Sequence, residues 1–344
     1  MGFTAWYLSL LYLIAISPDV FNGSNEFQEN MVRDSEIVNL VNQFRQQDIN
    51  KADDGQIILD YQKHTTTHDS TDNAERRLFK SVDAALLEKD TYKKWIALIN
   101  EFEPEVGIEE KNTPQKKKAI DDFLDAIFKT TIWKNLFQAK FAYYAKKEKN
   151  CKTLFKFSNK YFNMKNNGTT ITAILLQGHP YATDLKIFRA WIRQLWFGRY
   201  SRKFRFIDSS GFEHVFVGEL KNDEVNGMHS WLRFYLLERN ASQQFDYHGY
   251  TVKRANFMAA VKFSWRNHLK RSTSIFIGTS PEFDMALYTL CFLTRQSRNT
   301  CKFEVDGCPF FITSYNFKQQ GKNFIGTIYP VSGPFTDKCR YHNS

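Results

Sequence analysis

Long hydrophobic runs are scarce in this chain of 344 residues. The run from Ala5 to Ile16 is too short to span a bilayer as a helix, which requires about 20 residues. Its length instead fits the core of a signal peptide, which we place at residues 1–22 and which predicts a secreted protein. The alternative is a small membrane anchor, because no Lys or Arg precedes the run. N-myristoylation is excluded because Trp6 stands where Ser or Thr is needed.

Cysteine is also sparse, with five residues in the whole chain: Cys151, Cys291, Cys301, Cys308 and Cys339. These are too few and too scattered for a disulfide scaffold or for a zinc site of paired CxxC motifs. One or two bridges with one thiol left over would fit this count, and the sequence leaves the pairing open. Three glycosylation sequons are compatible with the secretory pathway, and they begin at Asn22, Asn167 and Asn240.

Charge and aromatic content are plentiful. Lys and Arg number 47 against 37 Asp and Glu, which gives a formal net charge of +10. Such an excess attracts polyanions such as RNA or an anionic membrane surface, although plain solubility explains it equally well. The chain is 42% hydrophobic and 16% aromatic, so we expect a globular fold.

The order of hydrophobic patterns predicts an α+β fold. Helical spacing begins behind Asp34-Ser35, and helices are expected over Phe79–Glu103, Pro114–Lys146, Asp184–Phe197 and Phe283–Leu293. The last of these is apolar on nearly every side and must be buried, with Ser280 as its cap. Strands are expected over Phe310–Ser314 and Phe324–Tyr329. We therefore predict a helical lobe over residues 34–205 and an α+β catalytic lobe of antiparallel sheets over 206–335, with the active site where the sheets meet.

Two histidines stand out in the stretch Asp208–Glu238. His214 lies in a run typical of a strand, with Val215 and Val217 in alternation, whereas His229 opens a helical pattern. Between them, polar residues and Asn226-Gly227 predict a loop with a tight turn that brings both imidazoles together. Two imidazoles suit acid and base catalysis near neutral pH, although either one alone could be a structural residue.

Basic residues interleave with aromatic ones in the segment from Gly198 to Arg205. We interpret its basic residues as RNA contacts and its aromatic residues as core. A second basic segment is either a solvated face or an RNA contact, and it contains Lys146, Lys147, Lys149, Lys152, Lys156, Lys160 and Lys165. The histidines His64 and His68 lie in a loop pattern without a third metal ligand, so a metal role there carries little weight.

The central stretch contains GFEHVFVGE followed by NGMHSWLRFYLLE, and this wording resembles the signature of the EndoU family of uridylate-specific endoribonucleases. The resemblance begins near Glu36. It continues through four further motifs in order, which are Phe263–Trp265, Phe276–Phe283, Ala286–Phe292 and Ile325–Pro330.

The resemblance implies a catalytic trio of His214, His229 and Lys270, the lysine lying five positions after Trp265. In such a site, a base activates the 2′-hydroxyl of RNA, an acid protonates the 5′-oxygen, and a cation stabilises the phosphorane. The reaction is a transesterification of the phosphorus–oxygen lyase type that leaves a 2′,3′-cyclic phosphate. The order of the two histidines as base and acid stays open.

The resemblance also implies supporting roles for Glu213 and Glu219, either in orienting a histidine or in holding a metal ion. Family members similar to the frog enzyme depend on manganese, and the sequence does not identify a site for Mn²⁺. Thr327 and Tyr329 match residues that contact the uracil or phosphate, and the period of a strand places both on one face. His248 and His268 have no counterpart in the family pattern and are taken as bystanders.

Three functions compete at this point. The first is a uridylate-specific endoribonuclease that acts on single-stranded, U-containing RNA as a monomer, without stable membrane insertion. The second is a catalytically silent, secreted RNA-binding protein, which predicts the loss of at least one member of the trio. The third is another hydrolase, but the sequence has no Gly-x-Ser-x-Gly elbow. The intact trio favours the endoribonuclease.

Overall fold

The computed structural model describes residues 32–138, 185–203, 206–295 and 300–341. Residues 33–344 form one compact unit. The predicted leader, the second basic segment, Cys151 and the sequons at Asn22 and Asn167 lie outside the described residues. No helix in the described ranges combines the length and the apolar character that crossing a bilayer requires.

The helices confirm most of the predicted pattern. Their bounds are α2 Asp34–Gln47, α3 Ala84–Leu87, α4 Asp90–Ile99, α5 Pro114–Lys129, α9 Leu185–Phe197, α10 Trp231–Arg239, α11 Pro281–Thr294 and α12 Asp337–Tyr341. The expected single helix Phe79–Glu103 is wrong, because its first residues form strand β2 and only α3 and α4 follow. The helix expected to run from Pro114 is interrupted at Thr130, and residues 131–138 form a separate helical segment.

The strands form a five-stranded sheet in the order β5-β6-β9-β8-β7, a three-stranded sheet in the order β10-β11-β12 and two small pairs, β1-β2 and β3-β4. All pairings are antiparallel except β6 with β9. The bounds are β1 Ile57–Leu59, β2 Phe79–Val82, β3 Arg199–Tyr200, β4 Ser209–Ser210, β5 Glu219–Lys221, β6 Glu224–Asn226, β7 Phe245–Arg254, β8 Met258–Trp265, β9 His268–Phe276, β10 Thr300–Val305, β11 Cys308–Gln319 and β12 Lys322–Ser332.

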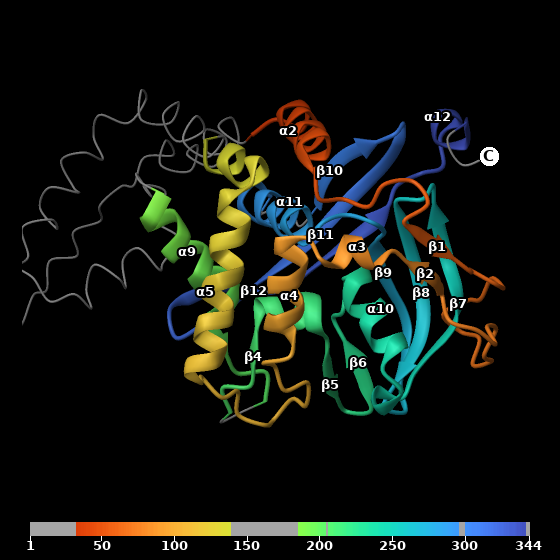
Figure 1. Ribbon diagram of the computed structural model, residues 1–344, viewed down its shortest axis with the longest axis horizontal. Coiled ribbons are helices and arrows are strands. Elements are labelled where there is room, and N and C mark those ends of the chain that lie inside the picture. Colours follow the sequence, from red (N-terminus) through yellow and green to blue (C-terminus); the bar gives the residue numbers. More distant parts are fainter. Residues whose placement is uncertain (1–31, 139–184, 204–205, 296–299, 342–344) are drawn as a thin grey trace, which may run out of the picture. The chain divides into compact units, whose positions relative to one another are not determined.

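Helix α11 is the centre of the core. All residues from Pro281 to Phe292 are buried, as its apolar composition predicts, and Ser280 Oγ caps the helix by accepting a hydrogen bond from Phe283 N. Contacts join α11 to α2 and α4 on one side and to all three strands of the β10-β11-β12 sheet on the other (Figure 1). Helices and sheets are thus packed around one buried element.

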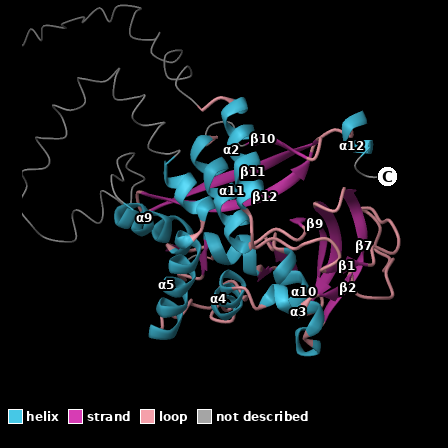
Figure 2. Ribbon diagram, turned by 45° about the horizontal axis from the view of Figure 1, so that its top comes forward, coloured by secondary structure: helices cyan, strands magenta, loops and turns pink. Residues whose placement is uncertain are grey.

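The helices α4, α5 and α9 gather away from strands β7 and β9 (Figure 2). Disulfides Cys291–Cys301 and Cys308–Cys339 settle the pairing that the sequence left open; they join α11 to β10 and β11 to α12. The mixture of helices and mainly antiparallel sheets confirms the α+β class. Strands β9 and β12, one from each larger sheet, contact each other. The proposed catalytic and substrate residues come from these two strands, from the segment before β5 and from the segment between β6 and α10.

Candidate active site

His214 does not lie in a strand. Residues Glu213–Val217 form a π-helix, in which all five side chains are buried, so the alternation of Val215 and Val217 did not indicate a half-solvated strand. Gly218 ends this turn with a φ of 87°, and its N–H donates to the carbonyl of Glu213. The turn places His214 at the start of a short, fully packed element that contacts β12.

His229 reaches the same place through a hairpin. Strands β5 and β6 are joined at Asn222-Asp223, whose φ values of 51° and 60° are those of a tight turn. The chain then passes Gly227, and the N–H of Met228 donates to the carbonyl of His214 at 3.0 Å. The tight turn therefore lies earlier than the predicted Asn226-Gly227.

Gly227 lets the two histidine segments approach. It has a φ of 67°, and a Cβ at this position would lie 1.7 Å from the carbonyl oxygen of His214. One residue further on, the N–H of His229 donates to the carbonyl of Val215 at 2.6 Å. Backbone contact between residues 227–229 and the π-helix thus fixes the separation of the two imidazoles.

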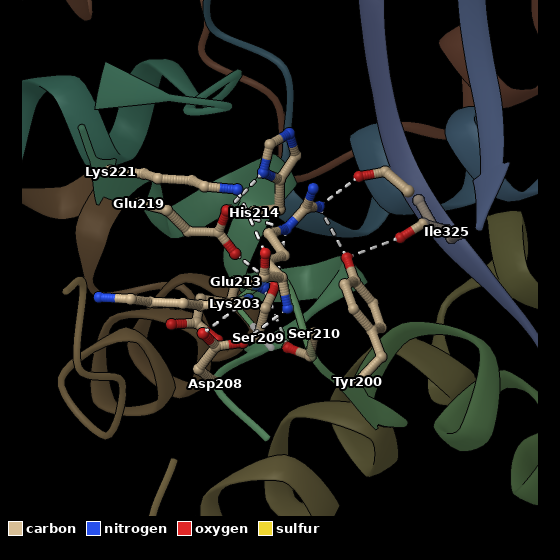
Figure 3. Close-up of polar contacts among 12 residues, drawn as sticks. Tyr200, Lys203, Asp208, Ser209, Ser210, Glu213, His214, Glu219, Lys221 and Ile325 are labelled. Carbon is tan, nitrogen blue, oxygen red and sulfur yellow. Dashed lines mark hydrogen bonds and ion pairs between the residues drawn. The ribbon is translucent and has the colours of Figure 1, made fainter. Parts of the chain in front are cut away.

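Glu219 orients His214. Its Oε2 lies 2.7 Å from His214 Nδ1 and 3.0 Å from Arg202 Nε, and its Oε1 accepts a hydrogen bond from Ser209 Oγ (Figure 3). Because a carboxylate can only accept, Nδ1 of His214 carries the proton and Nε2 is left for a substrate. These partners hold the pKa of the Glu219 carboxyl below its usual range, even though the group is buried.

Arg202 is part of this hydrogen-bond network. Its guanidinium binds Glu219, donates to Tyr200 Oη at 2.8 Å and donates to the carbonyl of Gly326 in β12. Tyr200 in turn donates to the carbonyl of Ile325 at 3.0 Å (Figure 3). The prediction that Arg202 contacts RNA is therefore corrected: this arginine ties the carboxylate behind His214 to the strand that carries Thr327 and Tyr329.

His229 is held by uncharged groups. Its Nδ1 lies 3.0 Å from the carbonyl oxygen of Ser274 in β9, so this nitrogen donates and Nε2 again is left for a substrate. Its ring stacks on the ring of Tyr329, with centroids 5.3 Å apart and an angle of 28° between the planes. Ser230, the next residue, caps helix α10.

Lys270 lies in β9, and its ammonium interacts electrostatically with the two histidines and with the carboxylate of Glu224. Burial lowers the pKa of its ammonium to about 8, and the carboxylate of Glu224 opposes this shift. The charge of Lys270 in turn contributes to lowering the pKa of both His214 and His229. The structure therefore places the three predicted catalytic side chains close enough for the charge of Lys270 to act on both histidines.

The two histidines differ in how strongly their surroundings lower the pKa of the imidazole. Burial lowers the pKa of His214, and the adjacent Glu219 carboxylate works against that shift. Burial lowers the pKa of His229 well below 6.5, with Lys270 as the next cause and only the carbonyl of Ser274 opposing it. His229 therefore favours the neutral form more strongly than His214 does.

Thr327 and Tyr329 share a face of β12, as predicted, while Ile328 is fully buried on the other face. Thr327 lies opposite Tyr315 and Tyr329 opposite Thr313 in the β11–β12 ladder. Because Tyr329 also stacks on His229, this half-exposed face continues directly from the histidine pair.

Residues 36–164 and 164–330 match the family model described as "Endoribonuclease XendoU". This chain belongs to the XendoU endoribonuclease family. It is 31% identical to uridylate-specific endoribonuclease C of Xenopus laevis over 93% of this chain and 99% of that protein. It is 32% identical to the uridylate-specific endoribonuclease of Bos taurus over 83% of this chain, which spans 62% of that protein's length.

The solved structure of XendoU, a splicing-independent snoRNA-processing endoribonuclease, aligns with a TM-score of 0.64 at 26% identity. The alignment covers 88% of this chain and 98% of that one. As a member of the XendoU family, the chain is an endoribonuclease, and the family resemblance of its motifs is confirmed.

Glu213 forms no hydrogen bond with either histidine of this endoribonuclease. It lines a cavity of about 310 Å³ together with Glu110, Lys116 and Ser210. Among the described residues, no donor hydrogen-bonds to either of its carboxyl oxygens. Burial raises the pKa of Glu213 well above its usual range, and the carboxylates of Glu110 and Glu219 add to this. Glu213 therefore does not orient His214, in contrast to Glu219.

Manganese has no ready site at the two histidines. Both oxygens of Glu219 already accept hydrogen bonds, and nowhere in the described part of the chain do three His, Cys, Asp or Glu side chains form a metal-binding group. The 310 Å³ cavity contains the carboxyl groups of Glu213 and Glu110, but Lys116, Lys117, Arg193 and Arg199 also line it, so its charge does not suit a divalent cation. One oxygen of Glu110 is already bound by the ammonium of Lys116.

The loop with His64 and His68 has a structural explanation. The fully buried ammonium of Lys262 donates to Thr65 Oγ1 and to the carbonyls of Asp69 and Thr71, and this anchors the loop to β8. His248 lies 3.3 Å from Ser264 Oγ. Neither His64, His68 nor His248 joins the active site.

Sequence reasoning missed several residues of the site. Ser209, Arg202 and Tyr200 act through Glu219 or β12, and Ser274 contributes only its backbone carbonyl. No local pattern marks a backbone carbonyl as a partner. An arginine and a tyrosine two residues apart, shortly before the Glu213-His214 motif, were the one available signal for the network.

Proposed function

We propose that this endoribonuclease cleaves single-stranded RNA at uridylates and leaves a 2′,3′-cyclic phosphate. The observation that carries the proposal is the pair of buried imidazoles, His214 and His229, each held through Nδ1 so that Nε2 is available, with the ammonium of Lys270 beside them. Two imidazoles and one cation are the groups that an internal attack by the 2′-hydroxyl requires.

His229 is the general base in this proposal. Its low pKa keeps the imidazole neutral, so its Nε2 can accept the proton of the 2′-hydroxyl. The 2′-oxygen then attacks the adjacent phosphorus and forms a pentacoordinate phosphorane. The proton released by the nucleophile stays on His229 until it is passed to solvent.

His214 is the general acid. Because the Glu219 carboxylate favours the imidazolium, His214 can hold a proton on both ring nitrogens. The proton on Nε2 passes to the 5′-oxygen as the phosphorus–oxygen bond breaks. The products are a strand with a 2′,3′-cyclic phosphate and a strand with a free 5′-hydroxyl.

Lys270 stabilises the charge on the phosphorane. Its pKa of about 8 leaves it mostly protonated at neutral pH, and burial strengthens its attraction to the equatorial oxygens because water does not screen it. Since its charge also disfavours protonation of both histidines, it supports the neutral form of His229 before RNA binds.

Thr327 and Tyr329 form the base pocket in this proposal. Stacking on Tyr329 supplies affinity at about 1–3 kcal/mol for any base, so discrimination must come from hydrogen bonds to the edge of the uracil. The hydroxyl of Thr327 lies on the same face of β12 and can donate or accept such a bond.

The test of the proposed function is cleavage of a DNA oligonucleotide that carries one ribouridine. We expect a single cut on the 3′ side of that nucleotide, with the cyclic phosphate identified by mass spectrometry. A matched strand with 2′-deoxyuridine should resist cleavage because it lacks the nucleophile. Cleavage of both strands, or products with a 5′-phosphate, would contradict the 2′-hydroxyl mechanism.

We propose that the protein passes through the secretory pathway. The support is the leader run, the two disulfides and the sequon at the exposed Asn240, next to the end of α10. Expression in a secretory host should release a protein that lacks the leader and carries a glycan at Asn240. Recovery of unglycosylated protein that begins at Met1 would contradict this.

A further inference from the structure

A second cavity, of about 250 Å³, adjoins the start of β9, the strand that carries Lys270. Its walls come from segment Glu105-Val106, from Lys203, from the tip of the β5–β6 hairpin and from His268. This volume is below the ~300 Å³ that typically encloses a small-molecule ligand, so the cavity fits part of a longer chain better than a free cofactor.

Three basic side chains from three different elements line this cavity. Lys203 follows β3, Lys221 ends β5 and His268 begins β9. The Lys221 ammonium donates to the carbonyl of Arg202 at 3.2 Å, which leaves two of its three protons for other partners. His268 Nδ1 lies 2.8 Å from the carbonyl of Arg266, so this nitrogen donates. Its Nε2 lies 3.8 Å from the exposed carboxylate of Asp223, beyond hydrogen-bond distance, and can still bind a ligand.

The backbone around these groups is fixed in advance. Asp208, a buried carboxylate, accepts hydrogen bonds from the N–H groups of Arg202, Lys203 and Gly107. The two acidic residues of the wall each have a basic neighbour: Asp223, whose side chain is fully exposed, lies 3.8 Å from His268 Nε2, and Glu105 lies 3.9 Å from the guanidinium of Arg266. The remaining charge suits a phosphate group.

The cavity also has the right spacing from the proposed catalytic centre. His268 and Lys270 are two residues apart in β9 and therefore face the same side of the sheet, about 7 Å from each other. Arg202, whose carbonyl binds Lys221, also holds Glu219 behind His214. An RNA strand leaving Lys270 toward His268 would thus meet the cavity within about one nucleotide.

We propose that this cavity is a subsite for the phosphodiester of a nucleotide that flanks the cleaved uridylate, with Lys203, Lys221 and His268 as its phosphate ligands. The inference rests on the proposed function and extends it along the substrate. It also revises the role of His268, which the sequence alone marked as a bystander, and among the described residues of segment 198–205 it assigns an RNA contact to Lys203.

The first experiment measures binding of a short RNA whose only uridylate is 2′-deoxy, so that no cleavage occurs. Lys203→Gln and His268→Gln should each weaken binding about threefold to tenfold. Lys203→Gln should also reduce the slope of log K against log salt by about 0.7, the value for one phosphate contact on a single strand. The control is Lys302→Gln, at an exposed position in β10.

The second experiment neutralises the phosphate instead of the protein. A methylphosphonate at the linkage on one side of the uridylate should weaken binding to the wild type, and much less to the Lys203→Gln, His268→Gln double variant, because the contact is already lost. Separate strands modified on the 5′ and on the 3′ side identify the flank. Equal effects of both modifications in wild type and double variant would overturn the subsite.

Cleavage separates this inference from the proposed function. The ratio of kcat/KM for a hexanucleotide to that for the dinucleotide UpA should fall about tenfold in the double variant. An unchanged ratio, with unchanged salt slopes, would overturn the subsite while cleavage of UpA by the wild type still upheld the proposed function. Binding losses without any UpA cleavage would uphold the subsite and refute the cleavage mechanism.

Discussion

The two histidine regions of this endoribonuclease solve the same geometric problem with different partners. His214 sits in a π-helix and binds a buried carboxylate, Glu219, whereas His229 precedes an ordinary helix and binds a backbone carbonyl. Both arrangements fix the ring through Nδ1 and leave Nε2 for RNA. They differ in charge, since His214 has a carboxylate as its partner and His229 has an uncharged carbonyl.

That difference teaches how one site can hold an acid and a base of the same residue type. Burial lowers the pKa of both imidazoles, and Glu219 opposes this shift only for His214. Nearby charge rather than burial therefore separates their roles. The pattern follows the general rule that environments which push two pKa values apart define the acid and the base.

The largest expected effect comes from removing either imidazole. His214→Ala and His229→Ala should each lower kcat by several orders of magnitude on RNA, and Lys270→Ala should do the same, while binding survives because only interactions in the transition state are lost. Single-turnover cleavage of a ribouridine oligonucleotide measures this. The exposed His68, replaced by Ala, is the control.

A substrate with a good leaving group distinguishes the two histidines. Uridine 3′-(4-nitrophenyl phosphate) needs little protonation of its leaving oxygen, so His214→Ala should recover most of its activity on it, and His229→Ala should not. Recovery in His229→Ala alone would reverse the assignment. Full activity of all three alanine variants on RNA would refute the trio itself.

Gly227 allows the two histidine segments to lie in contact, so its substitution should disturb both. In Gly227→Ala the added Cβ cannot coexist with the carbonyl of His214, and the segment of His229 must move away. We expect kcat to fall at least a hundredfold, together with a lower melting temperature. Circular dichroism and single-turnover kinetics measure the two effects.

Gly321→Ala is the matched control. Gly321 has a similar φ of 72°, but nothing lies within 4 Å of the added Cβ. In Gly321→Ala the free energy of unfolding should fall only by the ~1–2 kcal/mol that a side chain costs in the left-handed conformation. The variant should keep its kcat. Equal behaviour of the two variants would show that the close approach at Gly227 does not set the site.

Glu219→Gln should make His214 resemble His229. Because the negative charge of Glu219 raises the pKa of His214, its removal lowers that pKa, and the alkaline limb of the kcat–pH profile should move to lower pH. We expect kcat to fall about 10- to 100-fold, as is typical for partners that orient a functional histidine. An alkaline limb that stays in place would mean that another group, such as Lys270 with its pKa of about 8, sets it.

The smallest effects are expected on the base pocket beside His229. Tyr329→Ala should raise KM about tenfold through lost stacking, and Thr327→Ala should mainly reduce the preference for U over C. Matched oligonucleotides with a single ribo-U or ribo-C measure both. Undiminished preference for U in both variants, at unchanged stability, would place the uracil pocket elsewhere.

The fold was largely predictable where buried residues recur with the period of a helix or of a strand. Helix α11, its cap Ser280 and the strands β11 and β12 lie where the sequence places them, because their hydrophobic patterns match one secondary structure throughout. The prediction failed at Phe79–Val82, whose four residues are too few to display a strand pattern beside a helical one.

The site was predictable only in part. The residue types of the trio came from motif resemblance. The strand predicted at His214 from the alternation of Val215 and Val217 is a π-helix, in which all five side chains are buried whatever their place in that alternation. The groups that make the histidines different are long-range: Arg202 acts from before the motif, and Ser274 contributes a carbonyl from β9. A single sequence carries no signal for such contacts.

The most direct test of the account is a nuclear magnetic resonance titration of the two imidazoles in the RNA-free protein, with wild type compared to Glu219→Gln. The signal of His229 should titrate at lower pH than that of His214 in the wild type, and Glu219→Gln should lower the pKa of His214 while it leaves that of His229 nearly unchanged. Equal pKa values in the wild type, or a shift of both histidines in the variant, would contradict the claim that Glu219 makes one imidazole the acid and leaves the other as the base.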